Sequence, residues 1–189
     1  LGRFEEAEDS FKKAIELKTD FAEAHSNLGV ALQDLGRFEE AEDSFKKAIE
    51  LKTDFAEAHS NLGNTLKELE RLEEAQASYT QAIALKPDFA EAHSSLGAIF
   101  KALGKSDEAL SSYRQAILLK PDYAEAHFNL GNTIREQGRF DEAEASYRQA
   151  IALKPDVAEA HYHLGVTLNG QGRFDEAEAS FTQATVLNP

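Results

Sequence analysis

Cysteine, methionine and tryptophan are absent from the 189 residues, and proline occurs only four times. Without cysteine, the chain forms no disulfide and offers no thiolate ligand to a metal. No apolar run approaches the roughly 20 residues that a membrane-spanning helix needs. No glycine-rich phosphate loop, nucleophile elbow or HExxH pattern occurs either. The sequence therefore predicts neither a membrane segment nor catalytic machinery, and it leaves the cellular compartment open.

Basic residues are also few. The chain carries 20 Lys and Arg against 34 Asp and Glu, a net charge of −14. Nucleic acids and anionic membranes attract clustered basic residues, so the charge disfavours both classes of partner. The six histidines do not cluster, and even His161 and His163 lie about 200° apart around a helix. The sequence therefore predicts no metal and no cofactor, and a protein or peptide as the partner.

A 34-residue period organises the chain. The segment Ala-Glu-Ala-His recurs at this interval, beginning at Ala22, Ala56, Ala90, Ala124 and Ala158. Counted from that alanine as position 1, leucine stands at position 7, glycine at 8, alanine at 20 and 27, and an aromatic residue at 24. Proline stands at position 32 in four repeats. A period of this length indicates stacked structural repeats.

The pattern resembles the tetratricopeptide-repeat family over the whole chain. The resemblance implies an all-α fold, a right-handed α-solenoid of antiparallel helix pairs. The residues agree, because two apolar stripes at helical spacing, over 24–35 and 38–49, are separated only by Gly36-Arg37. We expect one solenoid over 1–189, with a lone second helix at 1–21 and repeats at 22–55, 56–89, 90–123, 124–157 and 158–189.

Local signals complete this interpretation. Asp54 followed by Glu57 is typical of a capping box, in which the Asp side chain caps the helix start and the Glu reaches back. Gly29, Ala41 and Ala48 are small, so we expect them where helix backbones approach closely.

Positions 2, 5, 6, 9, 12 and 13 of each first helix lie opposite the apolar stripe. The resemblance implies that this face lines a concave groove that binds extended peptides. Asparagine recurs at positions 6 and 9, although it is a mediocre helix former, and its amide both donates and accepts hydrogen bonds. A ladder of such amides would bind a peptide backbone; the alternative is a tolerated polar residue copied by duplication. The candidate peptide-binding residues are Asn27, Asn61, Asn64, Lys67, Lys101, Phe128, Asn129, Asn132, Arg135 and Tyr162.

The leading functional hypothesis is a protein–protein interaction scaffold. The segments AHSNLG and GNTLKE are similar to the repeat arm of O-linked N-acetylglucosamine transferase, so a substrate-recruiting arm of a larger transferase is an alternative. Residues 1–29 are identical to residues 35–63, which keeps a self-stacking or engineered array open. The chain begins without methionine and its ends lack polar capping helices, so we expect a fragment with possible end-to-end self-association.

Overall fold

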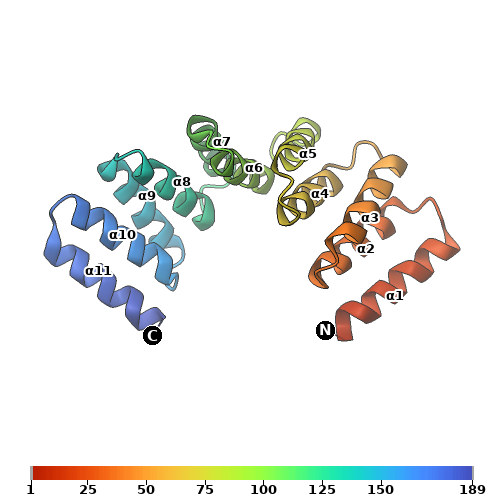
Figure 1. The fold of residues 1–189 in the computed structure, drawn as a ribbon, viewed down its shortest axis with the longest axis horizontal. Helices are drawn as coiled ribbons and strands as arrows, with labels where there is room; N and C mark the ends of the chain where they lie inside the picture. The colour runs from red at the N-terminus through yellow and green to blue at the C-terminus, as the bar shows by residue number, and fades with distance from the viewer. Residues whose placement is uncertain (1, 189) are drawn as a thin grey trace. The chain divides into compact units, whose positions relative to one another are not determined.

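The computed structural model describes residues 2–188, and side chains from residue 4 onward. Within that range every regular element is an α-helix and no strand occurs (Figure 1). The helices are α1 Gly2–Leu17, α2 Ala22–Asp34, α3 Phe38–Leu51, α4 Ala56–Glu68, α5 Leu72–Leu85, α6 Ala90–Ala102, α7 Ser106–Leu119, α8 Ala124–Glu136, α9 Phe140–Leu153, α10 Ala158–Gly170 and α11 Phe174–Leu187. The predicted all-α fold with two helices in each repeat is confirmed.

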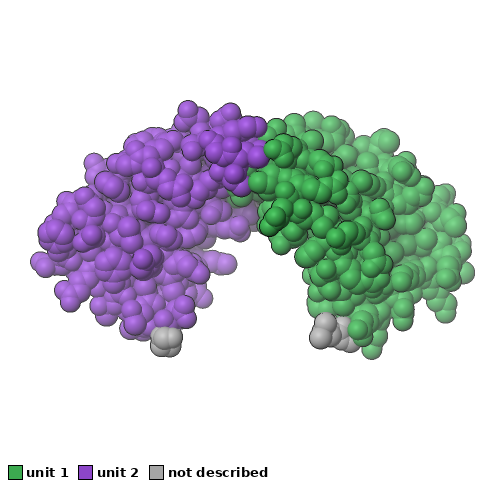
Figure 2. All heavy atoms as spheres, in the orientation of Figure 1, with its two compact units in different colours: residues 1–99 green, residues 100–189 purple. Residues whose placement is uncertain are grey.

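The chain divides into two compact units, residues 1–99 and 100–189 (Figure 2). In the first unit, α2 packs on α3 within one repeat, and α3 packs on α4 of the next. In the second unit, the same order runs from α7 through α8, α9 and α10 to α11. The first helices α2, α4, α8 and α10 therefore each lie between two second helices, which bury a wide arc of their surfaces. The single continuous solenoid over 1–189 stays a prediction.

Glycine ends the first helix of most repeats. Gly36 adopts a left-handed φ of 72°, and the amide of Arg37 donates to the carbonyl of Leu32 at 2.9 Å. This is the hydrogen bond of a Schellman motif, which satisfies a carbonyl at the end of the helix. Glu70 adopts φ 58° at the corresponding turn, and among the described residues it is the one non-glycine residue with positive φ.

The predicted capping box is wrong. Helix α4 begins at Ala56, its N-cap residue is Phe55, and no side chain caps it. Asp54 stands one residue too early to reach the free amides of the first turn. Glu57 instead accepts a hydrogen bond of 2.9 Å from Lys86, which follows the second helix of the same repeat.

The aromatic residue at position 24 is buried in four of the five repeats, and Phe181 of the last repeat is partly buried. The Phe45 and Tyr147 rings are fully buried, and burying one such side chain stabilises the fold by roughly 1.5–3 kcal/mol. A Cβ added to Gly29 would lie 2.7 Å from the Phe45 ring, and one added to Gly131 would lie 2.9 Å from the Tyr147 ring. Glycine at position 8 thus makes room for the aromatic ring at position 24. The expectation of a backbone approach at Gly29 is corrected accordingly.

Polar contacts join successive repeats. Arg71 donates to Glu42 of the preceding repeat at 2.6 Å, and the Glu42 side chain is only 9% exposed. Three of the periodic histidines hydrogen-bond to the turn before their own helix. The Nε2 atom of His127 donates to the carbonyl of Pro121 at 3.0 Å. His93 and His161 make the equivalent bond. These histidines therefore have a structural role.

Candidate functional site

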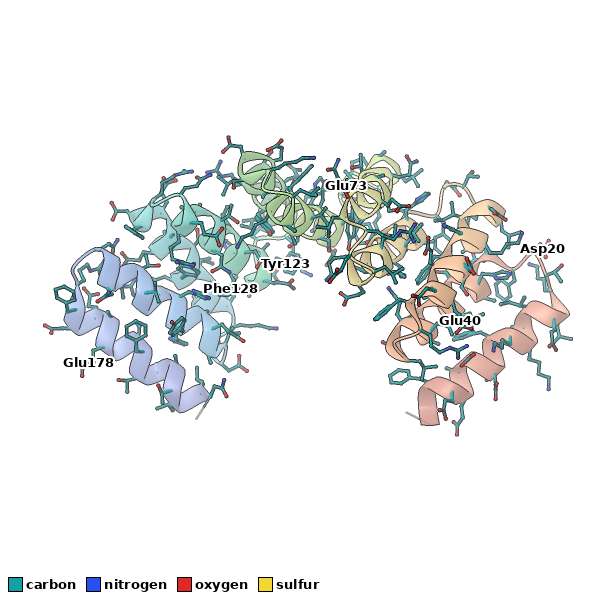
Figure 3. All side chains as sticks on the ribbon, viewed as in Figure 1. Asp20, Glu40, Glu73, Tyr123, Phe128 and Glu178 are labelled. Carbon is teal, nitrogen blue, oxygen red and sulfur yellow. The ribbon has the colours of Figure 1, made fainter. Side chains whose placement is uncertain are left out.

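A cavity of about 590 Å³ opens in the second unit between α8, the end of α9 and the start of α10. Three of the predicted peptide-binding residues come together on its wall: Phe128, Asn129 and Asn132, all from α8 (Phe128 is labelled in Figure 3). The rest of the lining comprises Ala124, Glu125, Ala150, Lys154, Val157, Glu159, Ala160 and His163. The cavity thus combines amides, an aromatic ring, an imidazole and both signs of charge.

The Asn132 amide is oriented by the helix behind it. The Tyr147 hydroxyl donates to Oδ1 of Asn132 at 2.8 Å and accepts from Nε of Arg135 at 3.2 Å. Burial raises the pKa of Tyr147, so its hydroxyl stays protonated and remains a donor. Because Oδ1 is engaged, the Nδ2 group of Asn132 is the part of the amide left for a ligand.

The first unit repeats this arrangement, since Tyr79 donates to Oδ1 of Asn64 at 2.6 Å. A signal in the sequence reveals the pairing. Where position 9 is asparagine in these two repeats, position 24 is tyrosine; where position 9 is valine, at Val30 and Val166, position 24 is phenylalanine.

An aromatic cluster lies beside the cavity. The His163 ring stacks at 14° on the Tyr147 ring, with centroids 6.0 Å apart, and Phe128 lies 5.7 Å from His163. Burial lowers the pKa of His163, and the positive charges of Arg135 and Lys101 lower it further. The imidazole is therefore neutral at neutral pH, and its buried Nδ1 has no hydrogen-bond partner among the described residues. His163 was not among the predicted site residues; its signal was the departure from asparagine at position 6.

The remaining predicted residues are not brought into this cavity. Asn27 is exposed on α2, and Asn61 is half-buried on α4. Lys67 forms an ion pair with the adjacent Glu68 at 3.1 Å, and Lys101 forms one with Glu136 at 2.8 Å. The basic side chains at position 12 thus already have partners within the chain.

Tyr162 lies at a second cavity, of about 360 Å³, between α10 and α11. It is 52% exposed, and its ring centroid is 5.7 Å from that of Phe181. Position 5 does not face solvent in the first unit, however. Ser26, Ser60 and Ser94 are buried there, so the predicted exposed face is wrong at this position. On α2 and α4, which contact two second helices and one another, the buried arc includes position 5.

Models of one family match along the whole sequence. The models described as tetratricopeptide repeat or TPR repeat match residues 1–36, 22–55, 44–77, 63–104, 99–156 and 135–189. The chain is built of tetratricopeptide repeats. No curated protein sequence matches it.

Solved tetratricopeptide-repeat structures share the fold. MamA is 27% identical, with a TM-score of 0.78 over 85% of this chain and 94% of that chain. YrrB, described as a TPR protein with an unusual peptide-binding site, is 26% identical, with a TM-score of 0.76 over 95% of this chain and 92% of that chain. PilF of Pseudomonas aeruginosa is 21% identical, with a TM-score of 0.89 over 100% of this chain and 86% of that chain.

Tetratricopeptide repeats are typical of protein–protein interaction scaffolds. Among residues 2–188, no group of three or more His, Asp or Glu side chains is placed to hold a metal ion. Over the same part of the chain, none of the helices has the length and apolar character needed to cross a membrane.

Proposed function

We propose that the chain is a protein-interaction scaffold that binds an extended peptide segment along its first helices, centred in the second unit on the 590 Å³ cavity. The observation that carries this proposal is the convergence of Phe128, Asn129 and Asn132 on one cavity wall. The other seven predicted residues, Asn27, Asn61, Asn64, Lys67, Lys101, Arg135 and Tyr162, extend the proposed surface along each unit.

The chemistry of the wall suits a peptide. An extended chain presents backbone carbonyls and amides that pair with asparagine, and side chains that fill apolar space. The Asn132 amide is held by Tyr147, so a ligand meets it without the entropy cost of fixing a free side chain. The similarity to YrrB, itself described as having a peptide-binding site, is consistent with this proposal.

Selection of random peptides displayed on phage tests the proposal. Enriched peptides are measured against the chain by fluorescence anisotropy. We expect Asn129→Ala and Asn132→Ala each to weaken binding roughly threefold to tenfold, since a hydrogen bond contributes about 1 kcal/mol. Gln149→Ala, on the exposed side of α9, is the matched control and should leave affinity unchanged. A selection without enrichment, or peptides indifferent to both asparagine variants, would exclude this function.

A second candidate is substrate recruitment for a larger transferase, as in the repeat arm of O-linked N-acetylglucosamine transferase. It is favoured by asparagine at position 6 in three repeats, at Asn27, Asn61 and Asn129. An amide ladder binds a backbone whatever its sequence, which suits an arm that presents many substrates. A reading frame around residues 1–189 that encodes no catalytic domain would remove this candidate.

A further inference from the structure

The chain already shows how its position 2 glutamates are used. Lys86 lies 2.9 Å from the Glu57 carboxylate, and its Nζ atom lies 4.7 Å from the centroid of the Phe89 ring. In the preceding repeat, Lys52 contacts Glu23 at 3.3 Å and the Phe55 ring at 4.7 Å. An ammonium group is thus held between a carboxylate and an aromatic face, the geometry of a combined ion pair and cation–π contact.

Within the described residues, the last two repeats lack this internal contact. The lysine that corresponds to Lys86 is Lys154, and Val157 replaces the aromatic residue that would support it. Among the described residues, Lys154 makes neither an ion pair nor a ring contact, and Glu125 is likewise without an ion pair. In the final repeat the corresponding residue is the uncharged Asn188, and Glu159 has no ion pair within residues 2–188.

The same two repeats gain an aromatic residue elsewhere. Phe128 and Tyr162 stand three residues after Glu125 and Glu159, and side chains three residues apart lie on one face of a helix. At this position the first unit has buried serines. In repeat 124–157 the aromatic residue therefore stands on the face of the first helix, as Phe128, and no longer three residues after the lysine, where Val157 stands. Both Phe128 and Tyr162 border a cavity.

Both cavities contain the resulting pair. Glu125, Phe128 and Glu159 line the cavity of about 590 Å³. Glu159 and Tyr162, with the Phe181 ring, line the cavity of about 360 Å³. Glu159 is shared by both, so the two cavities follow one another along the face of α8 and α10. Each offers a carboxylate and an aromatic ring without an internal ammonium between them.

We infer that the pairs Glu125–Phe128 and Glu159–Tyr162 bind lysine or arginine side chains of a basic, extended peptide. The inference rests on the proposed function and names the chemistry of its ligand. The net charge of −14 favours a cationic partner over the whole chain. Helices in contact lie about 8–10 Å apart, and α8 contacts α10, so the two cations should stand about three residues apart in an extended peptide.

Among the described residues, Lys154 is the one cation that lines the larger cavity, and it opposes a basic ligand there. Within the same part of the chain, no cation lines the smaller cavity. The Glu159–Tyr162 pair is therefore the stronger of the two sites. Removal of the Lys154 charge should strengthen binding at the Glu125–Phe128 pair, because Glu125 and Glu159 would then be the charged groups that face the ligand.

Short fluorescein-labelled peptides in a glycine–serine background test this inference. One peptide carries two lysines three residues apart, the second carries two norleucines at the same positions, and the third carries two glutamates there. Binding of each is measured by fluorescence anisotropy at low and high salt. We expect the lysine peptide to bind roughly tenfold more tightly than the norleucine peptide, and the difference to shrink with salt. Norleucine keeps the aliphatic stem, so the comparison isolates the charge.

Variants locate the effect. Glu125→Gln and Glu159→Gln should each weaken the lysine peptide roughly threefold to tenfold and leave the norleucine peptide unchanged. Lys154→Gln should strengthen it. Glu178→Gln removes the same charge from an exposed part of α11 outside both cavities, and should have no effect (Figure 3).

The outcomes separate this inference from the proposed function. Equal affinity for lysine and norleucine peptides, or a preference for glutamate, overturns the cation inference and leaves peptide binding intact. The cation inference is also overturned if Glu178→Gln weakens the lysine peptide as much as Glu159→Gln does. The net negative charge, and not a defined site, would then explain the binding. Failure of all three peptides, together with a phage selection that enriches nothing, overturns both.

Discussion

The hydroxyl of Tyr147 donates a hydrogen bond of 2.8 Å to the side-chain carbonyl of Asn132. Tyr79 and Asn64 make the same bond at 2.6 Å in the other unit. In two further repeats, valine stands at position 9 and phenylalanine at position 24. Four of the five repeats therefore use one of two matched combinations, one polar and one apolar, and the third repeat, with Ala98 and Tyr113, uses neither.

The pairing predicts rescue of one substitution by another. Tyr79→Phe should lower the free energy of unfolding by about 1 kcal/mol, because Asn64 loses its donor. Adding Asn64→Val should recover most of that loss, since the double variant reproduces the apolar combination of Phe45 and Val30. Urea denaturation of the two single variants and the double variant measures the coupling. Losses that simply add would show that the two positions act independently.

Replacement of Gly131 should cost far more than replacement of Asn129. A Cβ at Gly131 would lie 2.9 Å from the buried Tyr147 ring, and overpacking of this kind typically costs about 1–3 kcal/mol. Asn129 lines an open cavity, where a change to alanine should stay within about 0.5 kcal/mol. Denaturant midpoints of Gly131→Ala and Asn129→Ala give the comparison. Equal losses would contradict the assignment of these two positions to core and surface.

Glu70 should be replaceable by glycine with a gain in stability. Its φ of 58° lies in the left-handed region, where a side chain costs roughly 1–2 kcal/mol relative to glycine. The corresponding turns have Gly36, Gly104, Gly138 and Gly172. We expect Glu70→Gly to raise the free energy of unfolding by about 1 kcal/mol. The control is Gln81→Gly, at an exposed position in the middle of α5, which should lower the free energy of unfolding by about 1 kcal/mol. If both variants changed the stability in the same direction, the argument from φ would be contradicted.

Stability should fall on acidification, partly through Glu42. Burial alone raises the pKa of this carboxyl, but hydrogen bonds from Lys46 and Arg71 outweigh burial and leave the pKa below its ordinary value of 4.5. A carboxyl with a lowered pKa stabilises the fold above the unfolded-state pKa, and that contribution is lost as the pH falls through the folded-state pKa. Thermal midpoints should therefore decline below about pH 4.5.

Two variants isolate this contribution. Glu42→Gln should cost about 1–2 kcal/mol at neutral pH, because hydrogen bonds to a charged group are lost, and should flatten the acid limb. Glu42→Leu follows the chain's own example, since Leu110 occupies the same position of another repeat and is buried. It should also flatten the acid limb. If the decline of the thermal midpoint below about pH 4.5 were unchanged in both variants, other carboxyl groups would be its cause.

The sequence predicts the helix pairs well because each apolar stripe has a clear helical period, and Gly36 marks the turn between them. It predicts the site less completely. A helical wheel places position 5 on the exposed face, but α4 contacts α2, α3 and α5, so Ser60 is buried. His163 and Lys154 reach the cavity through side-chain placement between α9 and α10, which no local pattern encodes. The Tyr–Asn pairing is visible in the sequence only when two distant positions are compared.

End-to-end self-association stays a prediction, and the exposed ring of Phe174 indicates where the contact would form. Phe140 packs near Gly170 of the following helix, whereas its counterpart Phe174 on α11 is 66% exposed. Contacts between two copies through this end would be heterologous and need not close, so they favour weak chains over a defined dimer. Phe174→Ser copies the residue of another repeat, Ser106, and should suppress concentration-dependent association in sedimentation velocity. Leu118→Ser is the control, because Leu118 is 73% exposed and lies away from the end. If both variants reduced association equally, general surface hydrophobicity would explain it; a strict monomer at high concentration would remove the prediction.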